Sequence, residues 1–190
     1  NSIFLLRIDF SLQQILQMKP IAVFIGRFQP FHYGHQAIID HLVDLGYDPC
    51  MLIGTPIKKT DRNPISFFKT YNSISGPSPI EWSIISEPLY DCDDNHSWVK
   101  LLDELLTKHI PATTFHLVVH NKPSEAGKYG LPEDHFISDY ILANATKITG
   151  SIDLSSMETP SINATDIRNS MSELLKLAPR SSLQTLLEAL

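Results

Sequence analysis

The sequence contains few cysteines, no long apolar run and no internal repeat. Its two cysteines, Cys50 and Cys92, lie far apart and match no metal-ligand spacing. We expect reduced thiols in a cytoplasmic protein, and a disulfide between the two stays an alternative. No apolar run reaches the roughly 20 residues that a helix needs to cross a bilayer, so no membrane partner is expected.

The sequence also lacks an excess of basic residues. Its 15 Lys and Arg against 21 Asp and Glu give a formal net charge of -6. Nucleic-acid binders usually present a basic face, and here Lys and Arg are scattered, so no nucleic-acid partner is expected. An acidic protein that binds phosphates must concentrate its positive charge locally, which draws attention to each Arg beside a glycine-containing turn.

The length indicates one domain with a substantial core. The chain has 190 residues and no linker or low-complexity tract. Met18 directly precedes the first predicted strand, so it is a natural start. We interpret residues 1–17 as an N-terminal extension or a cloning remnant that is peripheral to the chemistry, and residues 18–190 as a single domain.

Hydrophobic patterning predicts strands that alternate with helices. Apolar runs predict strands over residues 21–25, 50–53 and 114–120, with a weaker candidate over 80–85. Helical periodicity predicts helices over 35–45, 97–106, 165–175 and 182–190, and Asn63-Pro64 predicts a helix start that runs to about Ile74. Residues 132–156 are ambiguous, with short extended pieces around Phe136 and Ile152. This alternation predicts an α/β fold, a doubly wound parallel sheet.

The stretch GRFQPFHYGH, from Gly26 to His35, connects the first predicted strand to the first helix. Ligands of open parallel sheets bind beyond the carboxyl ends of the strands, and a helix N-terminus there attracts anions. Gly26 and Gly34 allow backbone to approach a ligand closely, and Arg27 adds charge. His32 and His35 are three apart, so in a first helical turn both can point at one phosphate. A zinc site is the alternative, but no third ligand lies nearby.

A second stretch that fits phosphate lies far downstream, in Ser161 to Arg168 (SINATDIR). Asn163 is a good N-cap, so a helix is expected to begin there. Thr165 and the following N–H groups can hold phosphate oxygens, and Arg168, one turn in, can bind the same anion with two N–H groups. Taken alone, the stretch could also be an ordinary capped helix with a surface Arg.

Together these stretches resemble the signatures of one superfamily. GRFQPFHYGH is similar to the HxGH signature of nucleotidyltransferases. Its longer form resembles nicotinamide mononucleotide (NMN) adenylyltransferases of archaeal type and of bacterial proteins that pair this activity with a Nudix hydrolase. SINATDIR resembles the ISxTxIR motif, with Asn163 where Ser usually stands. The resemblance runs from Pro20 to about Ala189 and implies a Rossmann-like fold. Because no Nudix motif follows Arg168, the resemblance implies a single-activity protein or an isolated domain.

Between the two signatures the resemblance is weaker. Asn95 and Trp98 resemble the family's Asn and Trp at the head of a helix, where the indole stacks on the nicotinamide ring; a core role for Trp98 is the alternative. The segment from His120 to Lys122 resembles the family's GHxKD loop, but Val119 replaces the Gly, which puts a phosphate or ribose contact of Lys122 in doubt.

One further motif departs from the family's pattern. Asn63 to Ser66 (NPIS) resembles the family's NPFT helix start, but Lys69 and Thr70 stand where the family has Glu-Arg. Any contact made by that Arg is therefore missing from this chain.

The resemblance implies that the protein transfers the adenylyl group of ATP to NMN, giving NAD and pyrophosphate. The implied catalytic residues are His32, His35 and Arg168. The implied ATP or phosphate contacts are Gly26, Arg27, Phe28, Gly34, Asn163 and Thr165. Mg²⁺ is expected to arrive on the ATP phosphates, without a carboxylate cage, and we expect a homo-oligomer. The alternatives are another HxGH nucleotidyltransferase, such as a cytidylyltransferase or a pantetheine-phosphate adenylyltransferase, and a nucleotide-binding regulator without turnover.

Overall fold

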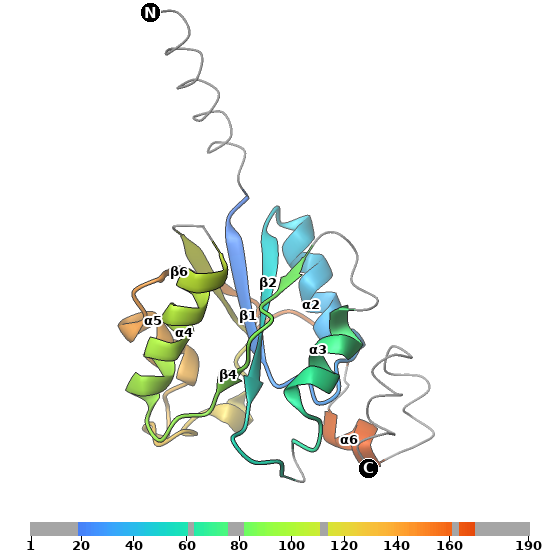
Figure 1. Ribbon diagram of the computed structural model, residues 1–190. Helices are drawn as coiled ribbons and strands as arrows, with labels where there is room; N and C mark the ends of the chain where they lie inside the picture. The colour runs from blue at the N-terminus through green and yellow to red at the C-terminus, as the bar shows by residue number, and fades with distance from the viewer. Residues whose placement is uncertain (1–18, 61–62, 76–81, 111–113, 161–163, 170–190) are drawn as a thin grey trace, which may run out of the picture.

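Figure 1 shows a computed structural model of the chain, which describes residues 19–60, 63–75, 82–110, 114–160 and 164–169. In chain order its elements are β1 (Ile21–Gly26), α2 (Tyr33–Asp44), β2 (Asp48–Thr55), α3 (Phe67–Ser75), β3 (Ser83–Ile84), β4 (Leu89–Tyr90), α4 (Asn95–His109), β5 (Phe115–Val119), η1 (Pro123–Glu125), α5 (Ile137–Asn144), β6 (Ile148–Asp153) and α6 (Ala164–Asn169). Strands and helices alternate along most of the chain, as the hydrophobic patterning predicted.

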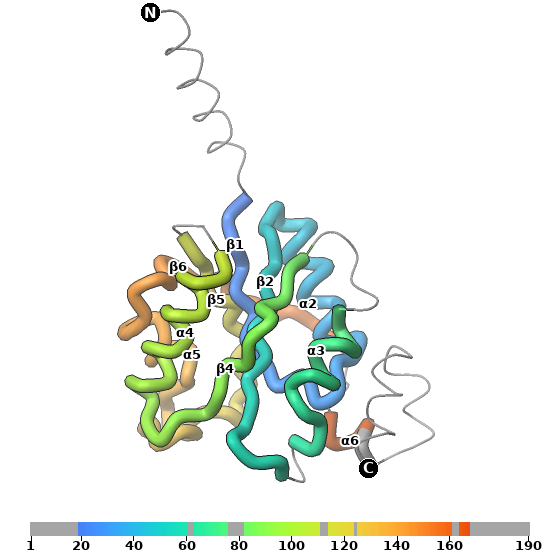
Figure 2. Tube along the Cα trace, viewed as in Figure 1, coloured from blue at the N-terminus to red at the C-terminus, as the bar shows by residue number. Residues whose placement is uncertain are grey.

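The strands form one parallel sheet with β1 at its centre. The order is β3-β2-β1-β5-β6, each neighbouring pair is parallel, and β4 pairs with β2 outside this path. The Cα trace in Figure 2 follows β1 and β2 through the middle of the molecule. This order confirms the predicted doubly wound α/β sheet, because the chain extends the sheet from β1 in one direction and then returns to extend it in the other.

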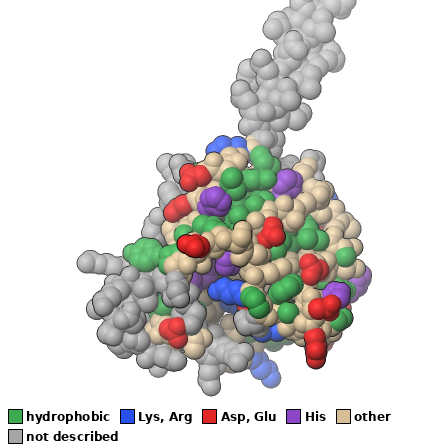
Figure 3. Space-filling model, turned by 180° about the vertical axis from the view of Figure 1, so that it is seen from behind, with side chains coloured by type: hydrophobic (Ala, Val, Ile, Leu, Met, Phe, Trp, Pro, Cys, Tyr) green, Lys and Arg blue, Asp and Glu red, His purple; other side chains and the backbone are tan. Residues whose placement is uncertain are grey.

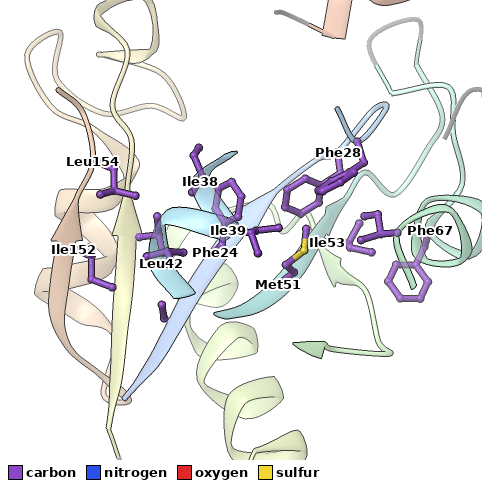
Figure 4. Packing of buried hydrophobic residues seen from close by; sticks show 14 residues of the cluster. Phe24, Phe28, Ile38, Ile39, Leu42, Met51, Ile53, Phe67, Ile152 and Leu154 are labelled. Atoms are coloured by element: carbon purple, nitrogen blue, oxygen red, sulfur yellow. The ribbon is translucent and has the colours of Figure 1, made fainter. Parts of the chain in front are cut away.

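Alternate side chains of the central strands face two separate cores. Phe24 of β1 and Met51 of β2 pack with α2 and α3 on one face, and Figure 4 shows this cluster. Val23 and Leu52 pack with α4 and α5 on the opposite face. Because both faces are covered, these strands are apolar along almost their whole length, which explains why they were recognisable as continuous apolar runs.

Helix α3 begins later than predicted. Asn63 does not cap it; its backbone N–H and its side-chain amide both donate to the Thr60 hydroxyl, at 3.2 and 3.3 Å. Pro64, Ile65 and Ser66 are not helical, and the first helical residue is Phe67. The predicted cap is wrong because Asn63 closes a local turn with Thr60, a common competing use of Asn.

The elements that were not predicted include α5 and β4. The ambiguous stretch contains α5, which begins after Phe136, where the Asp139 carboxylate accepts the Phe136 N–H at 3.0 Å. Phe136 is therefore the residue before a helix rather than a separate extended piece, whereas the piece around Ile152 is β6. The two-residue strand β4 is too short to leave a pattern in the sequence. Short elements such as these depend on tertiary contacts more than on periodicity.

Some predictions fall partly or wholly outside the described residues. Of the helix predicted over residues 165–175 the structure describes only the part within α6, Ala164–Asn169. The helix predicted over 182–190 and the extension 1–17 lie outside the described residues. Among the described residues, none of the helices combines the length and apolarity that a bilayer crossing requires.

Candidate functional site

Two adjoining cavities open at the centre of the sheet, beyond the carboxyl ends of β1 and β5. The chain leaves β1 toward the face covered by α2 and leaves β5 toward the face covered by α5, so this is a topological switch point, where ligands of such sheets bind. The two cavities share a wall made by Ile25, Gly26, Asn121, Glu125 and Ile137.

Each cavity has its own set of polar side chains. The histidine cavity, of about 340 Å³, is further lined by residues that include His32, Gly34, His35, His120, Lys122 and Ala164. The tryptophan cavity, of about 470 Å³, is further lined by residues that include Arg27, Asp91, Asp94, Asn95, Trp98 and Tyr129. His32, Gly34 and His35 of the predicted phosphate site therefore line one cavity, and Asn95 and Trp98 of the predicted mononucleotide site line its neighbour.

The turn after β1 is shaped by the buried ring of Phe28. This residue has a φ of 50°, and its ring centroid lies 5.4 Å from that of Phe24 and 5.0 Å from that of His35. A Cβ at Gly26 would lie 2.7 Å from the Phe28 ring, so no larger residue fits there without a shift. Phe28 was predicted to contact phosphate. In the structure its ring is buried in the core, where it packs against the His35 ring and supports the turn.

His32 and His35 stack on each other at the N-terminus of α2. Their ring centroids are 3.7 Å apart with 21° between the planes. His32 Nδ1 accepts the Gly34 N–H at 3.2 Å, and His35 Nδ1 accepts the His32 N–H at 3.3 Å. A Cβ at Gly34 would lie 3.1 Å from the His32 ring, so this glycine lets the His32 ring fold back over the helix start. The spacing predicted that both rings share one face, and they do.

Burial and nearby basic groups lower the pKa of the three histidines that line the histidine cavity. Burial and then Lys122 lower the pKa of His32 to about 4. Burial, His32, Lys122 and His120, in that order, hold the pKa of His35 well below its usual value. Burial and Lys122 also lower the pKa of His120. The structure therefore brings Lys122 beside the histidine pair, and Figure 3 shows histidine and Lys or Arg surfaces side by side on the rear face.

The loop after β5 carries Lys122 and is held by hydrogen bonds of Asn121. The Asn121 N–H donates to the Ser155 hydroxyl at 3.1 Å, and its amide oxygen accepts the Ser138 hydroxyl at 3.1 Å. These bonds tie the loop to α5 and to the segment after β6. The sequence drew attention to Lys122, but the part played by His120 and Asn121 becomes visible only when these three segments come together.

Gln29 fixes the turn from the side away from the cavities, and sequence reasoning missed it. Its buried amide donates to the Ile65 carbonyl at 2.8 Å and accepts the Ile65 N–H at 2.9 Å. The turn is thereby joined to the segment before α3. The available signal was the single amide inside the otherwise apolar run FQPF, because a buried Gln must find partners.

The tryptophan cavity brings together Trp98 and Asn95 from the start of α4. Trp98 is partly exposed, lines the cavity and also packs against the core beneath α4. The two alternatives for this residue are therefore compatible, one part of the indole being available for a ligand and another for the core. The Asn95 amide donates to the Tyr129 carbonyl at 3.0 Å, which ties the helix start to the loop after η1.

Arg27 lies in the tryptophan cavity rather than in the histidine cavity. Its Nη2 donates to the Asp91 carboxylate at 2.7 Å, while the buried Nη1 has no hydrogen-bond partner among the described residues. Arg27 was expected to contact the phosphates with the histidines. In this structure its guanidinium is paired with Asp91 and adjoins the shared wall through Gly26.

The downstream motif is described only in part. Ala164, the first residue of α6, lines the histidine cavity. Thr165 is exposed on the same helix, and Arg168 belongs to it by backbone, its side chain being outside the described part. Asn163 lies outside the described residues. Ala164 therefore brings α6 to the cavity of the histidine pair, and the shared anion site stays a prediction.

A metal cage is not found among the described residues, where no three His, Cys, Asp or Glu side chains are grouped to hold an ion. Neither cysteine takes part in a disulfide; Cys50 is buried in the core and Cys92 is partly exposed beside Arg27.

No protein family matches this chain, and no curated protein is similar to it in sequence. Solved structures are similar to it in fold. One is the bifunctional NMN adenylyltransferase/ADP ribose pyrophosphatase of Francisella tularensis complexed with AMP and a Mn ion, with a TM-score of 0.63 and 22% identity over 90% of this chain and 50% of that one. This chain thus spans about half the length of that protein.

Two further structures share the fold. The NadR protein in complex with NR has a TM-score of 0.60 and 17% identity over 86% of this chain and 45% of that one. The nicotinic acid mononucleotide adenylyltransferase of Plasmodium falciparum complexed with APC has a TM-score of 0.52 and 15% identity over 90% of this chain and 95% of that one. The fold is therefore the Rossmann-like α/β fold of these nucleotidyltransferases.

Proposed function

We propose that this protein transfers the adenylyl group of ATP to NMN and releases NAD and pyrophosphate. The observation that carries the proposal is the shared wall between the histidine cavity and the tryptophan cavity at the switch point of the sheet. A reaction between two ligands needs two adjoining sites. The GRFQPFHYGH turn borders both of them, since Gly26 belongs to the common wall.

The triphosphate of ATP fits the histidine cavity. His32 and His35 lie at the helix N-terminus, and Lys122 is electrostatically close to both. Ala164 brings the start of α6 to the same cavity, so Thr165 and Arg168 are the further candidates for phosphate oxygens. Together these groups offer hydrogen-bond donors and positive charge where the triphosphate carries its negative charge.

The nicotinamide ring of NMN fits against Trp98. The described charged residues that line this cavity are Asp91, Asp94, Glu125 and Arg27, and Arg27 is already paired with Asp91. An excess of carboxylates favours a cationic pyridinium ring with a neutral amide and disfavours an added carboxylate on the ligand. We therefore propose the amide mononucleotide, rather than the acid, as the substrate.

The reaction needs no general base, because the mononucleotide phosphate is already ionised at neutral pH. One of its oxygens attacks the α-phosphorus of ATP, the bond from that phosphorus to the bridging oxygen breaks, and pyrophosphate leaves. Charge therefore moves onto the leaving group, where His32, His35 and Lys122 can stabilise it. Because the two cavities adjoin at Gly26, both reactants can be bound next to each other before the reaction. Mg²⁺ carried by the ATP phosphates would neutralise part of their charge.

The test is to incubate the protein with ATP, Mg²⁺ and NMN and to measure NAD and pyrophosphate. We expect both products in equal amounts, and NAD with pyrophosphate should regenerate ATP. The matched control is His41→Ala, in the last turn of α2, which should behave as wild type. Turnover with CTP or with phosphopantetheine instead would favour a different nucleotidyltransferase. ATP binding without any turnover would favour a nucleotide-binding regulator.

A further inference from the structure

The N-terminus of α2 is capped by two histidines, where proteins usually place short polar residues. His32 is the N-cap, and its Nδ1 accepts the Gly34 N–H at 3.2 Å. His35 is the third helical residue, and its Nδ1 accepts the N–H of His32 at 3.3 Å. This is the reciprocal arrangement of a capping box, with imidazoles in place of the common Ser or Thr and Glu or Gln.

The cap decides which ring nitrogen carries the proton. A nitrogen that accepts a hydrogen bond has no proton of its own, and a neutral imidazole has only one N–H. Both rings are therefore held as the Nε2–H tautomer, with Nε2 as the remaining donor. An imidazolium would carry a proton on Nδ1 as well, so charging either ring would break one bond of the cap.

The surroundings oppose charge on the rings. The two rings stack at 3.7 Å, so two imidazolium ions would repel each other. Lys122 and His120, from the loop after β5, face the same cavity, and Glu125 is its one described acid. Asp153, at the end of β6, acts on His120 rather than on the pair. Burial and these basic neighbours are the causes that lower the pKa of both rings.

We propose that each histidine of the pair has two separable functions, with Nδ1 capping α2 and a neutral Nε2–H donating to the bound anion. The positive charge of the anion site then comes from Lys122 and from the helix dipole, not from the imidazoles. The inference rests on the proposed function only for the identity of the anion, ATP. The cap itself belongs to the free protein.

Asparagine and glutamine separate the two functions. The Asn side-chain amide can occupy the position of Nδ1 and accept the same backbone N–H, but it has no atom near Nε2. The longer Gln side chain can bring an N–H donor to the position of Nε2, but it does not accept at Nδ1. The variants are His32→Asn, His32→Gln, His35→Asn and His35→Gln, measured for thermal unfolding and for ATP binding by calorimetry.

We expect the Asn variants to keep Tm within about 2 °C of wild type and to lose at least tenfold in ATP affinity. The Gln variants should lower Tm clearly and keep ATP affinity within about fivefold, after correction for the unfolded fraction. If both variants at a position lose stability and affinity together, the two functions are not separable and the proposal is wrong. ATP binding is measured without turnover, so an inactive protein would refute the proposed function and leave this test intact.

Histidine-ring ¹H–¹⁵N spectra provide a second measurement that needs neither turnover nor a stable variant. At pH 7 both rings should show the neutral Nε2–H tautomer, in the free protein and with pyrophosphate added. A Nδ1–H tautomer or an imidazolium on either ring would overturn the proposal. The ATP affinities of wild type and of His32→Asn should also change in parallel between pH 8 and pH 6. An ATP affinity that rises toward pH 6 in wild type alone would mean that the ring binds the anion in its charged form.

Discussion

The histidine cavity and the tryptophan cavity share a wall, yet the chain builds them in different ways. The first takes its histidine pair and Gly34 from one continuous segment at the start of α2, and the loop after β5, α5 and α6 complete it. The second is assembled from segments that include the end of β1, the loop after β4, the start of α4 and the loop after η1. A local segment keeps its geometry through caps and a glycine, whereas an assembled cavity depends on how its segments pack. The following predictions test this difference.

The largest expected effect is on turnover, from the histidine cavity. His35→Ala removes a transition-state donor and should lower kcat by roughly 10²–10³-fold, the usual effect of losing one such group. Binding of NMN should stay within about twofold, since the tryptophan cavity is untouched. Steady-state kinetics measure kcat and titrations measure the affinity for NMN, with His41→Ala as the control on the same helix. Activity within threefold of wild type would mean that His35 has no role in the reaction.

Gln29→Ala should lower the stability of the protein. Of the two cavities, it should affect only the histidine cavity. The substitution leaves the N–H and carbonyl of Ile65 without their buried side-chain partner, which should lower the free energy of unfolding by about 1–3 kcal/mol. Urea unfolding measures this effect. Gln36→Ala is the control, because Gln36 bonds Asp40 on the exposed surface of α2 and should change stability little. An unchanged free energy of unfolding in Gln29→Ala would show that the turn does not depend on this link.

Trp98→Ala should impair the tryptophan cavity and leave the histidine cavity unaffected. Loss of the indole should weaken NMN binding by about 1–3 kcal/mol, on the scale of aromatic–base stacking, and leave ATP binding nearly unchanged. NMN should quench the fluorescence of wild type, and Trp98→Phe should retain part of the affinity. If Trp98 serves only the core, Trp98→Ala should instead cost about 3–5 kcal/mol of stability, and the affinities for both ligands should fall together.

The smallest expected effect concerns Asp91. Asp91→Asn removes a carboxylate from the tryptophan cavity and releases the guanidinium of Arg27. The ratio of kcat/KM for the acid mononucleotide to kcat/KM for the amide mononucleotide should therefore rise roughly fivefold, which corresponds to about 1 kcal/mol. Stability should change by less than about 1 kcal/mol, because the pair is partly exposed to solvent. Asp93→Asn is the matched control, since Asp93 is exposed nearby. An unchanged preference would remove the charge argument for the amide.

Much of the histidine cavity could be predicted because its chemistry is local. The spacing of His32 and His35 was enough to place both rings on one face, and Gly34 marked a place where another group comes close to the backbone, which in the structure is the His32 ring. The tryptophan cavity was predicted less fully. Asn95 and Trp98 drew attention through a family resemblance, while Asp91 and Tyr129 carry no local signal, since they reach the site only through loops.

The sequence by itself determined the parallel sheet, the order of its main elements and the position of the turn between β1 and α2. Each of these follows from interactions within a few residues: apolar runs that must be buried on both faces, and a helix start that follows a strand. Only the tertiary structure decided which neighbours complete the site. The pairing of Arg27 with Asp91, the clamp of Gln29 on Ile65 and the approach of Lys122 to the histidines join residues that are distant in the chain, and such contacts form only when separate elements pack against the same sheet.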